Sequence, residues 1–132
     1  MIFSRETPLG TIVTLKRSTW EEKIINLNGN NDTGIHGSSH LDMLGHEALV
    51  EDSVVKPHQI VRDLQVVAQS DGSDIYLVSE TRLEYYRMVV VDSNQRLIKT
   101  VVEMKDSEHG EVVTAHWTKR VDSSSMEGRV VY

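Results

Sequence analysis

The chain contains no cysteine, which excludes disulfides, zinc–thiolate sites and a thiol nucleophile. No apolar run approaches the roughly 20 residues that a membrane-spanning helix needs. The opening residues, Met1 to Glu6, lack the basic-then-apolar pattern of a signal peptide. Aromatic residues make up only 5%, but 39% of the 132 residues are hydrophobic, enough for one core. We therefore expect a single cytoplasmic domain over residues 1–132, without a membrane segment.

Positive charge is also in short supply. The formal net charge is −6, which argues against a protein that coats nucleic acid nonspecifically. A local basic groove remains compatible with this value, because the distribution of charge decides where a polyanion binds. The sequence also has no glycine-rich phosphate loop, no nucleophile elbow and no dinucleotide fingerprint, so P-loop, α/β-hydrolase and Rossmann enzymes are not expected.

The first part of the chain predicts helices. A short strand over residues 10–17 precedes Ser18, which begins a Ser-x-x-Glu capping box typical of a helix start. The second helix is expected from Ser39 to just before Pro57, with a weak point at Gly45.

From Gln59 onward the apolar residues alternate, as in strands. The pattern predicts strands over 60–67, 75–78, 83–91, 97–104 and 112–117, with turns at 70–73 and 92–95 and an edge strand at 129–132. Helices followed by strands indicate an α+β fold. We expect two N-terminal helices packed on a twisted antiparallel β-sheet of four to five strands.

Five short motifs occur in an order that resembles a known group of proteins. They are Trp20-Glu21-Glu22-Lys23-Ile24, His40-Leu41-Asp42-Met43, Pro57-His58-Gln59-Ile60, Tyr85-Tyr86-Arg87 and Val112-Val113-Thr114-Ala115. This succession, over roughly residues 10–120, resembles the barnase/EndoU/colicin/RelE-like nuclease superfamily, in its phage- and toxin-associated variant. Two positions depart from that pattern: Lys23 stands in place of a helix histidine, and His40-Leu41-Asp42 in place of His-Pro-Glu.

The resemblance implies a metal-independent endoribonuclease of toxin or prophage type, with no cofactor. Its substrate would be RNA, possibly tRNA, and a cognate antitoxin or immunity protein is an implied partner. Such an enzyme needs a base for the 2′-hydroxyl, an acid for the leaving oxygen and cations for the phosphate.

The implied catalytic set joins side chains that suit these tasks. Histidine titrates near neutrality, and arginine matches phosphate oxygens. The predicted catalytic residues are Lys23, His40, His46, Arg82, Arg87 and Thr114, and the predicted substrate-binding residues are Tyr86, His116 and Lys119. Since neighbouring residues of a strand face opposite sides, one of Tyr85 and Tyr86 is expected in the core and the other exposed. By the same rule His116 shares a face with Thr114.

Two other interpretations stay open. The acidic charge and the missing helix histidine also suit a non-catalytic partner-binding or regulatory domain on the same scaffold. The histidines His36, His40 and His46, with Asp42 and Glu47, suit a small metal-dependent hydrolase. His36 and His40 are four residues apart, but Gly37 lies between them, so they form the i, i+4 pair of zinc hydrolases only if this loop is helical. We predict no metal site.

Overall fold

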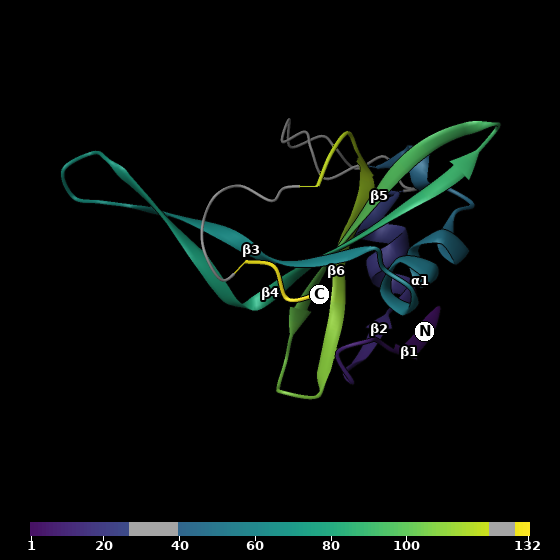
Figure 1. Cartoon of the computed structure of the whole chain (residues 1–132), viewed down its shortest axis with the longest axis horizontal. Helices are drawn as coiled ribbons and strands as arrows, with labels where there is room; N and C mark the ends of the chain where they lie inside the picture. Colours follow the sequence, from purple (N-terminus) through teal and green to yellow (C-terminus); the bar gives the residue numbers. More distant parts are fainter. Residues whose placement is uncertain (27–39, 122–128) are drawn as a thin grey trace.

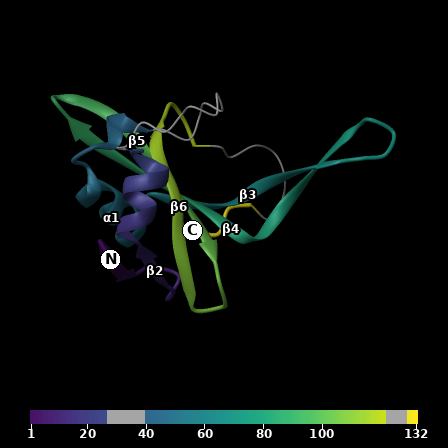
Figure 2. The same ribbon diagram turned by 180° about the vertical axis from the view of Figure 1, so that it is seen from behind.

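The computed structural model describes residues 1–26, 40–121 and 129–132. These ranges contain a six-stranded sheet in the order β1-β2-β6-β5-β4-β3. Its strands are β1 (Phe3–Glu6), β2 (Ile12–Leu15), β3 (Gln59–Ala68), β4 (Asp74–Val91), β5 (Asn94–Met104) and β6 (His109–Thr118). The helical segments are η1 (Thr19–Ile24), η2 (Leu41–Met43) and α1 (Glu47–Val55). Figures 1 and 2 show the helical segments gathered at one end of the sheet.

The predicted fold, two N-terminal helices on an antiparallel sheet of four to five strands, is wrong. The sheet has six strands and is mixed, because β2 runs parallel to β6 while the other neighbours are antiparallel. The sequence analysis missed β1 because only Phe3 is buried in this four-residue strand, so no alternation marks it.

The first predicted helix is a short π-helical segment, η1. The Ile25 N–H donates a hydrogen bond to the carbonyl of Trp20, five residues earlier, which is the pattern of a π-helical turn. Ser18 already has helical backbone angles and makes no side-chain capping bond, so the predicted capping box is wrong.

The second predicted helix is interrupted where expected. Gly45 adopts φ +84°, a conformation that favours glycine, and separates the single 3₁₀ turn η2 from the regular helix α1. The proposed capping residue, Ser39, lies outside the described residues.

One strand replaces two in the second half of the chain. The predicted strands 75–78 and 83–91 both belong to β4, which has 18 residues. Its first part pairs only with the far part of β3, and this hairpin projects from the rest of the fold (Figure 1). We call residues 64–78 the arm; its exposed apolar side chains are Val66, Val67, Ile75, Tyr76 and Leu77. The turn after β4 is confirmed, with positive φ at Asp92 and Ser93.

The two faces of the sheet differ in their cover. α1 packs on one face, where Tyr85 and Ile98 are fully buried and Ser53 bonds the Thr100 hydroxyl at 2.7 Å. The other face holds a small apolar cluster of Val61, Tyr86 and Leu97, packed with Val121. Within the described residues, no member of this cluster belongs to a helix.

The C-terminal residues lie along the outer edge of β3. Val130 forms a single bridge with Val61, and the Arg62 N–H donates to the Arg129 carbonyl at 2.6 Å. The predicted edge strand 129–132 is therefore reduced to one bridge, which protects the base of β3 but not the arm.

Candidate functional site

Two histidines meet at the C-terminal end of β6. The rings of His40 and His116 are stacked, with centroids 4.8 Å apart and planes inclined by 25°. Both residues are half-buried, so the pair borders solvent. Imidazoles accept and release protons near neutral pH, so a stacked pair at a surface is a candidate acid–base centre.

Backbone pairing brings these residues together from distant parts of the chain. The His40 N–H donates to the Ile24 carbonyl at 2.6 Å, which ties the start of η2 to the end of η1. On β6, His116 lies opposite Lys99 of β5, and Lys99 lies opposite Tyr86 of β4. Paired residues of adjacent strands share a face, so His116, Lys99 and Tyr86 form a row on the face that α1 leaves uncovered.

His116 is held in its neutral form. Burial, followed by the positive charges of His40 and Lys99, lowers the pKa of His116 to about 4, while Asp42 acts weakly in the opposite direction. Its Nδ1 atom is buried and has no hydrogen-bond partner among the described residues. At neutral pH this imidazole therefore carries no charge.

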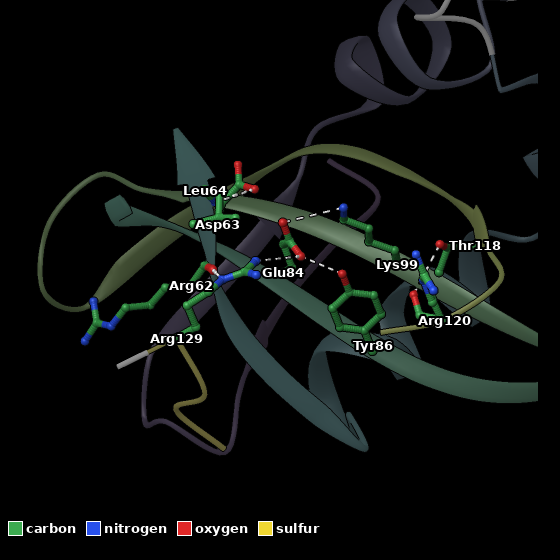
Figure 3. Close-up of polar contacts among 9 residues, drawn as sticks. All are labelled: Arg62, Asp63, Leu64, Glu84, Tyr86, Lys99, Thr118, Arg120 and Arg129. Carbon is green, nitrogen blue, oxygen red and sulfur yellow. Dashed lines mark hydrogen bonds and ion pairs between the residues drawn. The ribbon is translucent and has the colours of Figure 1, made fainter. Parts of the chain in front are cut away.

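A buried carboxyl lies two strands away in the same layer. Glu84 is 1% exposed and accepts a hydrogen bond from the Tyr86 hydroxyl at 2.5 Å; Lys99 Nζ is 3.5 Å and Arg129 Nη2 is 3.9 Å from its carboxylate oxygens (Figure 3). Burial raises the pKa of Glu84 to about 7, and Asp63 adds to the rise, whereas Tyr86 and Lys99 oppose it. Lys99 is thus adjacent to both groups with strongly shifted pKa values.

Four further predicted residues lie on segments next to the histidine pair. Thr114, two residues before His116, faces the same side of β6, as predicted. His46, at the start of α1, contacts the ring of Trp117 edge-on at 5.6 Å. Lys23 is exposed and precedes Ile24, the residue whose carbonyl binds the His40 backbone, and Lys119 is exposed just beyond β6.

Three predicted residues are not available at the histidine pair, because they lie away from it, bind other groups or are fully buried. Arg87 is on the opposite face of β4, where its guanidinium donates to the Lys56 carbonyl at 2.6 Å. Arg82 pairs with Glu103 at 3.6 Å, four residues along β4 from the histidine row. Tyr86 is fully buried, as is Tyr85, so the expectation that one of the two is exposed is wrong and Tyr86 is not placed to stack on a base.

Three residues near the pair were not predicted from the sequence: Lys99, Glu84 and Arg129. Lys99 faces His116 only through the register of β5 and β6, which no local pattern reveals. Glu84 did carry a signal, because a glutamate between Leu83 and Tyr85 in an apolar strand is a candidate buried charge.

The site contains no arrangement for a metal. Within residues 1–26, 40–121 and 129–132, no three His, Asp or Glu side chains lie together as a metal would require. His36, part of the predicted metal alternative, lies outside the described residues.

Two findings concern the described chain as a whole. The nine residues of α1 form its longest helix, and none of its helices has the length and apolar character of a membrane span. The chain matches no protein-family model, no curated protein and no solved structure.

Proposed function

We propose that the chain is a metal-independent endoribonuclease whose acid–base centre is the His40–His116 pair. The observation that supports this proposal best is the stacking of two half-buried imidazoles on a sheet face that also carries a lysine. Transfer of a phosphodiester needs a proton acceptor, a proton donor and positive charge. The pair can supply the first two, and Lys119, exposed just beyond β6, can supply the third.

The imidazole of His116 is unprotonated at neutral pH and can take the acceptor role, although its lowered pKa makes it a weak base. In the proposed reaction it takes the proton of the RNA 2′-hydroxyl while the 2′-oxygen bonds to phosphorus. His40 donates a proton to the departing 5′-oxygen, so the products are a 2′,3′-cyclic phosphate and a 5′-hydroxyl. Thr114, on the same face as His116, supplies a hydrogen bond to the phosphate, and the exposed Lys119, three residues after His116, supplies a positive charge.

This assignment changes the residues expected from the family resemblance. The side chains of Arg82 and Arg87 are bound to other groups away from the pair, so neither is included. Lys99 is only 19% exposed and pairs with Glu84, so its role is to keep His116 neutral rather than to bind the phosphate directly.

The test is cleavage of a labelled single-stranded RNA in excess EDTA. We expect His40→Asn and His116→Asn each to lower the rate by roughly 10²- to 10⁴-fold, the usual contribution of a positioned acid or base. His109→Asn is the matched control, because His109 is an exposed histidine at the start of β6, at the opposite end of the strand from His116. Retention of full activity by either site variant, or absence of cleavage by the folded wild-type protein, would contradict the proposal.

One observation favours a second candidate function, a non-catalytic domain that binds a protein. The arm exposes apolar side chains on both its faces, including 58% of Val66 and 55% of Tyr76. Exposed apolar groups of this extent are typical of protein contact surfaces, and the net charge of −6 suits a protein partner better than RNA. A folded chain that cleaves no RNA, with or without EDTA, would favour this function.

A further inference from the structure

A pocket of about 600 Å³ lies where β5 begins and β6 ends. Its polar and aromatic lining comes from Asp42, from Gln95 and Arg96 at the start of β5, and from Trp117, Thr118 and Lys119 at the end of β6. Asp42 is two residues from His40, and Trp117 and Thr118 directly follow His116. The volume lies within the range of roughly 300 to 1,000 Å³ that small-molecule sites occupy.

The wall of this pocket offers flat groups for stacking. The Arg96 guanidinium carbon lies 4.2 Å from the centroid of the Trp117 ring. Proteins bind unpaired nucleobases by stacking them on aromatic rings or on guanidinium planes, and both kinds of surface are present here. Gln95 and Thr118 add an amide and a hydroxyl that hydrogen-bond to base edges.

The cations of the pocket are not engaged by carboxylates. Within the described residues neither Arg96 nor Lys119 takes part in an ion pair, whereas Lys99 and Arg82 do. Both side chains are exposed, and Arg120, which follows Lys119 in the sequence, adds a third exposed positive charge. An acidic chain that leaves positive charge unpaired at one end presents a local attraction for phosphate.

We infer that this pocket is a nucleotide subsite of the bound RNA, in which the exposed Arg96 guanidinium, lying on the Trp117 ring, stacks on a base and Lys119 binds its phosphate. The inference rests on the proposed ribonuclease function for the position of the nucleotide relative to His40 and His116. Binding to the pocket itself does not require cleavage, so the two proposals fail separately.

The experiment measures binding of a 2′-O-methyl oligoribonucleotide, which lacks the attacking hydroxyl and stays intact. Trp117 is one of only two tryptophans, and the other, Trp20, is 3% exposed, so the Trp20→Phe protein reports on Trp117 alone. At one fixed salt concentration, we expect the oligonucleotide to quench this fluorescence and an abasic oligomer of equal length to bind roughly 10-fold more weakly.

Variants identify the subsite. Arg96→Ala and Lys119→Ala are each expected to weaken binding by roughly 10-fold, while Lys56→Ala, which removes an exposed lysine at the end of α1, leaves it unchanged. Equal binding of the abasic oligomer, equal quenching by an acidic peptide, or full affinity in both variants would overturn the subsite. Normal subsite binding without any RNA cleavage would instead contradict the ribonuclease and leave the subsite standing.

Discussion

Replacing Glu84 with glutamine is expected to change how the free energy of unfolding depends on pH. The carboxyl is buried, and its pKa is raised from 4.5 to about 7 in the folded protein. The folded state therefore binds more protons than the unfolded state between these values. This contribution to stability is complete below pH 4.5 and is lost as pH rises through 7.

The magnitude follows from the size of the shift. A shift of this extent corresponds to about 3 kcal/mol of differential stability across the window. Glu84→Gln removes the titrating group, so the difference in free energy of unfolding between variant and wild type should change by about 3 kcal/mol in favour of the variant from pH 4.5 to pH 7. A constant offset from lost contacts with Tyr86 and Lys99 does not affect this slope.

His116 acts in the opposite direction over much of the same range. Its pKa is lowered from 6.5 to about 4, so its contribution is present above pH 6.5 and is lost as pH falls through 4. In the wild type the two contributions oppose each other between pH 4.5 and 6.5. In Glu84→Gln, the contribution of His116 to the free energy of unfolding still rises with pH, and no opposing contribution from residue 84 remains.

The assay is urea unfolding at a series of pH values from 4 to 8, for the wild type and Glu84→Gln in identical buffers. Taking the difference between the two proteins cancels the titration of groups that both retain. Glu108→Gln makes the same chemical change at an exposed glutamate in the β5–β6 turn and is the matched control. Parallel curves for Glu84→Gln and the wild type would refute the reasoning.

Three further substitutions test the packing of the sheet. Ser53→Ala removes the buried bond to the Thr100 hydroxyl, and urea unfolding should show a loss of about 1–3 kcal/mol; no change would mean that this bond does not contribute. Gly110→Ala would place a methyl group 2.8 Å from a Val102 methyl, so calorimetry should show a lower Tm, corresponding to about 1–3 kcal/mol of overpacking. Ile98→Ala should cost about 2–5 kcal/mol in urea, because the side chain is fully buried against α1, and a cost under 1 kcal/mol would contradict this packing.

Local signals in the sequence predicted the local parts of the fold. The break at Gly45 and the turn at Asp92 and Ser93 depend on backbone conformations that a few residues determine. The parallel pairing of β2 with β6 joins residues about 100 positions apart, and no local pattern reports it. The prediction of a capping box at Ser18 was wrong because the backbone is already helical at that residue. The Ser18 hydroxyl therefore makes no capping hydrogen bond.

The candidate site was predictable as a list of residue types but not as an arrangement. His40 and His116 were both named from the sequence, yet their stacking depends on the bond from His40 to Ile24 and on the position of β6. Strand alternation was sufficient to place Thr114 beside His116. Strand alternation also places Arg87 and Tyr86 on opposite faces of β4, whereas the family resemblance had placed both residues in one site.

Lys99 connects the two shifted groups, and a single substitution tests this connection. Its charge lowers the pKa of Glu84 and also lowers the pKa of His116. Lys99→Met should therefore raise both pKa values, although one group is an acid and the other a base, because the same positive charge favours the carboxylate and disfavours the imidazolium. An NMR titration of the His116 ring protons measures this directly, with His109 as an internal reference in the same spectrum. If the His116 titration is unchanged in the variant, burial alone keeps this imidazole neutral, and the lysine is not what prepares it to accept a proton.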